Sequence, residues 1–215
     1  MLTAIAFLFL FYGEDASGHL VLWTRQDKQA RWFPANRLNA AGSLAEQLAL
    51  THDVYFGVAL QDKQAAFARW RKENPHHRGE PTTRGYSDTT VTLPGLWADI
   101  DVQGPAHTAV NLPPTKAAAR ALLTEFPLPP TLVIDTGHGL QTWWLFRELW
   151  VFEDEAERQA AQSLARRFLA TLQSIAKAHG WQIDPTADLA RLMRLPGTWN
   201  RKLDPLPVRV IEEAF

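Results

Sequence analysis

The sequence predicts an α+β fold with antiparallel or mixed sheets. Strand-like and helix-like segments alternate irregularly along the chain, without the regular βαβ repeat of a doubly wound sheet. Residues 131–135 and 140–146 are apolar and flank a short glycine turn, a pattern typical of a β-hairpin. With 215 residues, 46% of them hydrophobic and 21% charged, the chain is long enough for one domain or two closely packed modules.

Composition excludes several kinds of site. The chain has no cysteine, which excludes disulfides, thiolate zinc sites and cysteine nucleophiles. Its formal net charge is −1, so any contact with nucleic acid requires a local basic groove. This composition agrees with a cytoplasmic protein.

The apolar N-terminus does not fit a signal peptide or a membrane anchor. It has no basic region before the apolar run and no A-x-A cleavage site, and the run is too short to cross a bilayer. Residues 3–12 are therefore predicted to form a buried strand or a core helix, and no membrane partner is expected.

The first half of the chain is predicted to contain strands over 19–24, 30–33 and 53–60 and a helix over 39–50. Residues 61–85 are polar, contain two prolines and are predicted to form a loop. His76 and His77 lie in it, but adjacent loop residues rarely face one ion and no third ligand stands nearby, so a solvated loop is favoured over a metal site.

The second half begins with a predicted strand over 90–102. A helix over 116–126 follows, with Thr115 as its N-cap, and then the hairpin. The longest helix is expected over 153–179, because it has an acidic start, one apolar stripe and Gly180 at its end. A short strand over 181–184, one or two helical turns over 189–193 and a final strand over 208–211 complete the prediction.

Asp99 and Asp101 are the central candidate site residues. Alternation along a strand places both carboxylates on one face, with Ile100 on the other. Such neighbours repel each other unless a cation lies between them, and Mg²⁺ or Mn²⁺ prefers such oxygen ligands. The alternative is that Asp99 ends a strand and Asp101 begins a turn.

Two further segments add groups suited to phosphates. Gly137 and Gly139 lie in the turn D-T-G-H-G-L-Q. Its backbone N–H groups would be exposed, and a phosphate could approach them because glycine has no Cβ, although most hairpin turns use glycine for geometry alone. The segment 183–202 offers Asp184 as a further carboxylate. It also offers Arg191 and Arg194, which at helical spacing would clamp triphosphate oxygens or form a solvated basic face. Together the three segments indicate two-metal nucleotidyl transfer.

At these segments the chain resembles the archaeo-eukaryotic primase (AEP) superfamily, in particular the primase-polymerase branch of plasmid, phage and CRISPR-associated replication proteins. Residues 96–101 (LWADID) resemble its first motif, and Ile183-Asp184 its third. Residues 194–202 (RLPGTWNRK) resemble an RxPGTxNxK stretch, and 53–60 (DVYFGVAL) its N-terminal module. The resemblance covers most of residues 40–202.

The resemblance implies a single catalytic domain with an N-terminal α/β module over about 1–90 and an RNA-recognition-like module over about 91–215. The active site would lie in the cleft between them. It implies a template-dependent primase-polymerase that starts chains and extends them from nucleoside triphosphates on single-stranded DNA. A helicase or accessory primase domain would lie outside this sequence. The implied metal ligands are Asp99, Asp101 and Asp184, and the implied nucleotide-binding residues are Gly137, His138, Gln141, Arg191, Arg194, Asn200 and Lys202.

One position departs from the family pattern. The second motif usually carries a histidine that contacts phosphates, and Gln141 stands there. Gln141 then acts more weakly, His138 substitutes for it, or activity is reduced; the last case favours a second reading, a non-catalytic single-strand-binding module. A third hypothesis is a rolling-circle or relaxase-type nuclease, but that class needs a His-x-His metal pair, which this sequence does not supply. Asp184 is preferred over Asp188 as third metal ligand. Tyr55, Trp143 and Trp144 are assigned either to base stacking or to the core.

Overall fold

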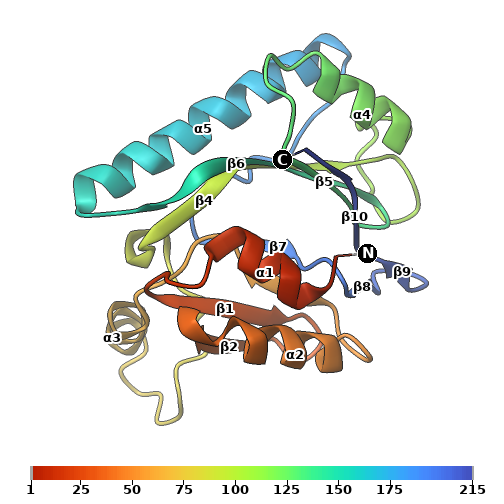
Figure 1. The fold of residues 1–215 in the computed structure, drawn as a ribbon. Helices are drawn as coiled ribbons and strands as arrows, with labels where there is room; N and C mark the ends of the chain where they lie inside the picture. The colour runs from red at the N-terminus through yellow and green to blue at the C-terminus, as the bar shows by residue number, and fades with distance from the viewer. Residues whose placement is uncertain (1, 215) are drawn as a thin grey trace.

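Two antiparallel four-stranded sheets lie one above the other in the computed structural model, which describes residues 2–214 (Figure 1). The first sheet has the strand order β2-β1-β3-β7. Its strands are β1 (His19–Thr24), β2 (Gln29–Pro34), β3 (Val54–Gly57) and β7 (Leu192–Arg194). Strand β7 comes from the C-terminal part of the chain and completes this otherwise N-terminal sheet.

The second sheet has the order β10-β5-β6-β4 and is also antiparallel, which confirms the predicted α+β class. Its strands are β4 (Thr92–Asp101), β5 (Leu132–Asp135), β6 (Gly139–Val151) and β10 (Arg209–Glu213). Strands β5 and β6 form the predicted hairpin. The short strands β8 (Trp199–Asn200) and β9 (Leu206–Pro207) pair only with each other.

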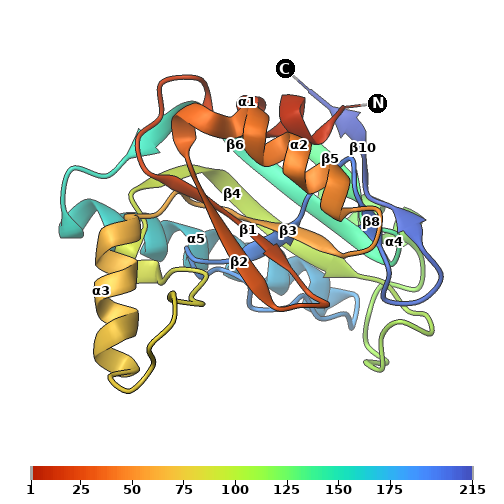
Figure 2. The same ribbon diagram turned by 90° about the horizontal axis from the view of Figure 1, so that it is seen from below.

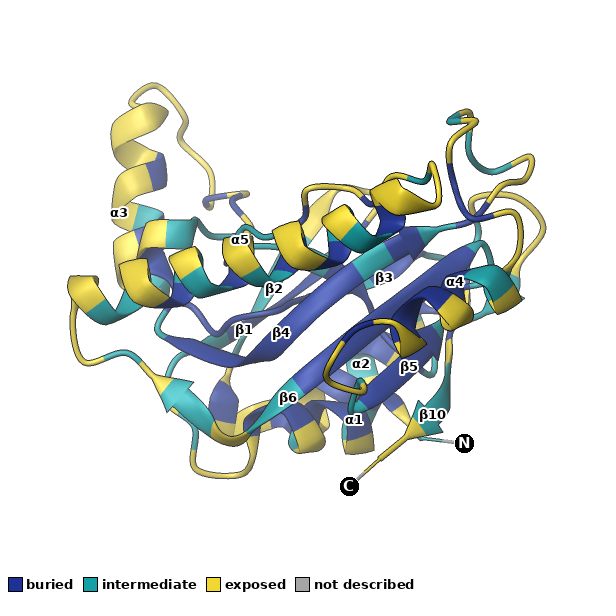
Figure 3. Cartoon of the chain, turned by 90° about the horizontal axis from the view of Figure 1, so that it is seen from above, coloured by how far each residue is buried: buried dark blue, intermediate teal, exposed yellow. Residues whose placement is uncertain are grey.

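Helices cover both sheets. Helices α4 (Lys116–Thr124) and α5 (Glu155–Ala178) lie on the outer face of the second sheet, with their solvent sides exposed (Figure 3). Helix α1 (Ala4–Tyr12) lies between the two sheets, beside α2 (Leu38–Leu48) (Figures 1 and 2). Two short 3-10 segments, Ala35–Arg37 and Ser87–Thr89, complete the fold together with α3 (Lys63–Glu73).

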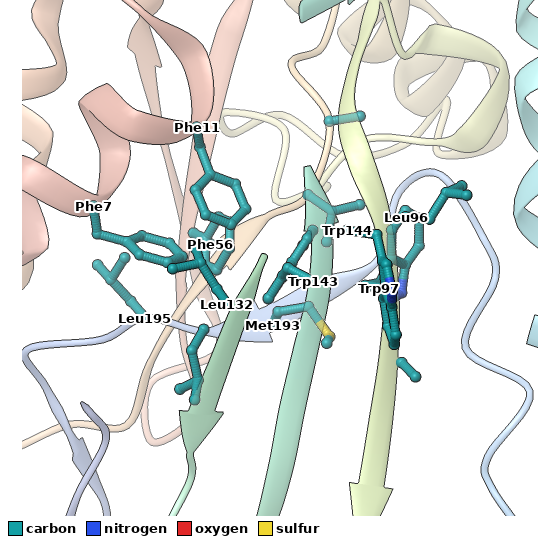
Figure 4. Packing of buried hydrophobic residues seen from close by; sticks show 14 of the residues in the cluster. Phe7, Phe11, Phe56, Leu96, Trp97, Leu132, Trp143, Trp144, Met193 and Leu195 are labelled. Atoms are coloured by element: carbon teal, nitrogen blue, oxygen red, sulfur yellow. The ribbon is translucent and has the colours of Figure 1, made fainter. Parts of the chain in front are cut away.

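The core between the sheets centres on the fully buried Trp143 (Figure 4). Its ring centroid lies 4.7 Å from that of Phe11, 5.9 Å from Phe56 and 5.8 Å from Trp97. Trp144 points to the other face of β6 and packs against Phe168 of α5 at 4.8 Å. Neighbours on a strand face opposite ways, and here both tryptophans are core residues, so the stacking alternative does not apply to them.

Three predicted elements are wrong. Residues 61–85 include α3, because Asp62 caps the backbone N–H of Ala65 and Ala66 and Trp70, four apart, are buried. Residues 181–184 form no strand; the segment is held instead by Gln182 N, which donates to the carbonyl of Asn111. Residues 189–193 are not helical: Arg191 N donates to the Asp188 carbonyl in an isolated turn, and the chain then extends into β7.

The N-terminal segment is a helix capped by the Thr3 side chain, which accepts from Ala6 N. Among residues 2–214, no helix combines the length and apolarity needed to cross a bilayer. The second sheet and its two helices occur along the chain in β-α-β-β-α-β order, from β4 to β10, with β7, β8 and β9 inserted between α5 and β10. The RNA-recognition-like character of this part, and the division near residue 90, stay predictions.

We expect Trp143→Ala to lower the free energy of unfolding by about 3–5 kcal/mol, because it leaves a cavity between the two sheets. Trp199→Ala is the matched control: Trp199 is 41% exposed, and its change should stay within about 0.5 kcal/mol. Urea denaturation measures both values. Equal losses in the two variants would contradict the packing described for Trp143.

Candidate active site

The pairing of β4 with β6 brings the first two candidate motifs together. Asp99 lies opposite Gln141, and Asp101 lies opposite Gly139. A Cβ on Gly139 would lie 2.6 Å from the carbonyl oxygen of Ile100, so only glycine allows this close approach of the two strands. Both aspartates line the same polar pocket, as strand alternation predicts.

The pocket has a volume of about 200 Å³ and lies where the two sheets meet. It gathers all the predicted site residues except Asp184 and Gly137. Those it contains are Asp99, Asp101, His138, Gln141, Arg191, Arg194, Asn200 and Lys202. The acidic strand and the basic segment, about 90 residues apart in the chain, therefore form the walls of one cavity.

The two carboxylates lie in an unfavourable electrostatic environment. Burial, and then the neighbouring charge of Asp101, raises the pKa of Asp99 to about 7. Burial also raises the pKa of Asp101, against the opposing effect of His107. A divalent cation with hard oxygen ligands would relieve this repulsion, so the donor set fits Mg²⁺ or Mn²⁺. Among residues 2–214, however, no three His, Asp or Glu side chains are gathered closely enough to hold a metal as a set.

Asp184 lies near these carboxylates but outside the pocket lining. Its charge raises the pKa of both Asp99 and Asp101, although its own side chain is exposed to solvent. Asp188, the alternative, lies 3.6 Å from the guanidinium of Arg191. The electrostatic link to both pocket carboxylates distinguishes Asp184 from Asp188.

The basic segment is anchored by Asp53, a buried residue that begins the predicted 53–60 strand. Its carboxylate accepts from the Arg194 guanidinium at 2.5 Å and from Arg201 N at 2.9 Å. The Arg194 guanidinium also lies 4.8 Å from the centroid of the Tyr55 ring. The predicted shared helical face of Arg191 and Arg194 is wrong, because this segment is extended and pairs with β3, yet both side chains reach the pocket.

The glycine turn is closed internally. The N–H of Gly137 donates to Asp135 Oδ1 at 2.8 Å and is therefore not free for a phosphate. Gly137 has φ +91°, which favours glycine, and it lies outside the pocket. Asn200 Nδ2 donates to the Thr136 carbonyl at 2.6 Å, and Asn200 Oδ1 accepts from Lys202 N at 3.0 Å. Asn200 thus joins the turn to the segment that carries Lys202.

Several pocket side chains have a buried polar atom without a hydrogen-bond partner among the described residues. These atoms are Nε2 of His107, Nε2 of His138, Oε1 of Gln141 and Nε of Arg191. Buried polar atoms are normally paired, so a cluster of unpaired ones indicates a site for a polar ligand. Burial, and then the nearby cations, lowers the pKa of His138.

Sequence reasoning missed Arg25, His107 and Thr136, which also line the pocket. His107 lies in the loop after β4, and its Nδ1 is 2.9 Å from Asp101 Oδ2. Thr136 belongs to the D-T-G-H-G-L-Q turn and could have been found from it. The local sequence around Arg25 and His107 carries no motif, and the only signal for His107 is that it follows Asp101 by six positions.

Asp53→Ala should lower the free energy of unfolding by about 3–5 kcal/mol, because it leaves the buried guanidinium of Arg194 without its partner. Asp88→Ala is the matched control, since it breaks an exposed pair with Arg69 and should cost less than about 1 kcal/mol. Urea denaturation of the two variants compares them. A loss for Asp53→Ala no larger than that for Asp88→Ala would argue against a buried anchor.

The raised pKa of Asp99 makes stability depend on pH in a defined direction. Between the usual carboxyl pKa of about 4 and about 7, the folded protein holds a proton that the unfolded chain releases. The free energy of unfolding therefore falls as pH rises through this window when metal is chelated. Asp99→Asn should remove this fall and, because Asp99 is only half-buried and solvent screens it, raise stability at pH 8 by about 1–2 kcal/mol.

Urea denaturation at pH 5 and pH 8 in the presence of a chelator measures this difference. Asp204→Asn, an exposed change in the loop between β8 and β9, is the control and should keep the wild-type pH dependence. The same pH dependence in wild type and Asp99→Asn would show that Asp99 titrates normally.

Comparison with known proteins places this geometry on a known fold. No protein-family model and no curated protein matches the chain. The AEP domain of the cyanophage S-2L primase-polymerase superimposes with a TM-score of 0.58 at 15% identity, covering 99% of this chain and 89% of that chain. The catalytic domain of primase RepB′, solved with initiator DNA, gives a TM-score of 0.49 at 18% identity, covering 98% and 83%. The first of these superpositions shows that the chain has the fold of that AEP domain, as the sequence resemblance predicted.

Proposed function

We propose that this chain is a primase-polymerase that transfers nucleotides from nucleoside triphosphates to a 3′-hydroxyl on a single-stranded DNA template. One observation carries the proposal: in a fold of this kind, Asp99 and Asp101 face a pocket whose other wall carries Arg191, Arg194 and Lys202. Carboxylates suit a divalent cation, and the cationic side chains suit phosphate oxygens. A triphosphate bound with a metal satisfies both walls at once.

The carboxylates would hold Mg²⁺ or Mn²⁺. Asp99 and Asp101 are the proposed ligands, with Asp184 as the third. When bound, the metal would neutralise developing charge on the phosphates and make the attacking hydroxyl more acidic. Asp99 must be ionised for this role, and binding of a cation would displace the proton that its raised pKa retains.

The pocket cations would orient the triphosphate. Arg194 has a fixed position, because its guanidinium is held between Asp53 and the Tyr55 ring. Lys202 is placed through Asn200, and Arg191 contributes a buried Nε that has no partner among the described residues. Fixed donors of this kind stabilise a transferring phosphoryl group without reorganisation. Gln141 and His138 are proposed as additional contacts, whereas Gly137 shapes the turn.

The second candidate is a single-stranded nucleic-acid or nucleotide-binding module without efficient chemistry. It is favoured by the absence of a ready three-residue metal cluster among residues 2–214 and by the uncharged Gln141. A helicase or accessory primase partner, and association with a phage, plasmid or CRISPR locus, fit either candidate.

A primer-extension assay together with a de novo dinucleotide assay tests the proposal. Wild type should form product only with Mg²⁺ or Mn²⁺, and Asp99→Ala or Asp101→Ala should reduce the rate at least about 100-fold, because each removes a metal ligand. Asp204→Ala, an exposed aspartate outside the pocket, is the matched control and should keep the wild-type rate.

Two results would decide against polymerase activity. If wild type binds single-stranded DNA or triphosphates but forms no metal-dependent product, the binding module is the correct function. If product forms equally well with Asp99→Ala and Asp101→Ala, the chemistry lies elsewhere.

A further inference from the structure

His107 is held in the pocket by a structured loop. The loop between β4 and α4 is fixed by Gln103, whose side chain donates to the carbonyls of Val110 and Leu112, each at 3.0 Å. A tight turn follows, in which His107 N donates to the Gly104 carbonyl at 3.1 Å. The His107 side chain is only 12% exposed and lines the pocket. Its position is therefore set by the fold and not by a mobile tip.

The two ring nitrogens of His107 have different surroundings. Nδ1 lies 2.9 Å from Asp101 Oδ2, a contact that fixes the orientation of the ring. Nε2 is buried and has no hydrogen-bond partner among residues 2–214. Buried polar atoms are normally paired, so an unpaired one in a polar pocket points to a ligand atom.

The charges around the ring decide which kind of ligand fits. Lys202 Nζ lies 3.5 Å from Nδ1 of His107, and both side chains line the same pocket. The same pocket wall carries two arginines beside Lys202, so an anionic oxygen at Nε2 is attracted there, whereas a divalent cation is repelled. Gln141, the neighbour of Asp99 across the strands, offers no positive charge for such an oxygen.

We propose that His107 is a phosphate-contacting residue, with Nε2–H donating to the triphosphate of the nucleotide and Asp101 orienting the ring. The assignment rests on the proposed function, because it takes the triphosphate as the substrate of this pocket. It gives the pocket an imidazole donor from the loop after β4, at a place in the chain where the local sequence shows no motif.

Two conservative substitutions separate this role from simple support of Asp101. In His107→Asn the amide nitrogen takes the place of Nδ1, so the contact with Asp101 is kept and the phosphate donor is lost. In His107→Gln the amide nitrogen reaches the place of Nε2, so the donor is kept. Binding of ATP and dATP with Mn²⁺, measured by calorimetry, should weaken about 10- to 100-fold in His107→Asn and less than about threefold in His107→Gln.

AMP is the matched ligand and should bind both variants as it binds wild type, because the contact is with the outer phosphates. His76→Asn, in an exposed loop, is the control substitution.

Mn²⁺ affinity without nucleotide, measured by electron paramagnetic resonance, should stay within about twofold of wild type in both variants. Thermal unfolding checks that both variants are folded. If His107→Asn does not fold, the test passes to His107→Gln, which must retain both the triphosphate affinity and the Mn²⁺ affinity.

The outcomes distinguish this assignment from the function itself. Wild-type triphosphate affinity in His107→Asn overturns the assignment and leaves the polymerase proposal intact. Loss of Mn²⁺ affinity in either variant makes His107 a metal ligand and also overturns it. A wild-type protein that binds no triphosphate overturns both proposals.

Discussion

The pairing of β4 with β6 is the constraint on which the site depends. It places Asp99 opposite Gln141 and Asp101 opposite Gly139 at the glycine turn. The two strands are not consecutive in the sequence, because α4 and β5 lie between them. Glycine permits the close approach at two points: a Cβ on Gly95 would lie 2.4 Å from the Trp144 carbonyl, and one on Gly139 would lie 2.6 Å from that of Ile100. A slip of one residue would turn both carboxylates toward the helices and out of the pocket. Packing of Trp143 and Trp144 on opposite faces resists that slip.

The second requirement is that the basic segment meets the carboxylates from the other sheet. Strand β7 joins β3, and Asp53, just before β3, binds both Arg194 and the backbone of Arg201. A buried ion pair of this kind contributes little net stability, since desolvation offsets its attraction. Its consequence is positional: it fixes the cationic side chains of the basic segment in the wall of the pocket that Asp99 and Asp101 also line.

Local patterns predicted much of the fold and part of the site. The hairpin, α4 and α5 have clear periodicity and caps, and Asp99 and Asp101 share a face because strand alternation requires it. The arginines of the basic segment were misplaced on a helix, because a spacing of three fits a helix while the pairing with β3 is set by residues far away in sequence. His107 could not be found, since its place depends on how the 102–115 loop folds over Asp101. The polar composition of 61–85 concealed α3, which buries only a narrow apolar face.

The balance of charge favours catalysis over simple binding. In a pocket that only held phosphates, Asp99 and Asp101 would lower the affinity, because carboxylates repel phosphate oxygens. They would also lower the stability of the fold, because burial disfavours their ionised forms and so raises the pKa of both. Removing them would improve both stability and affinity in a pure binding module. The arrangement is useful only if a cation joins the carboxylates to the phosphates, and a metal-bridged triphosphate beside a hydroxyl is the arrangement that nucleotidyl transfer requires. The acidic wall thus argues for chemistry in this pocket even though Gln141 brings no charge to it.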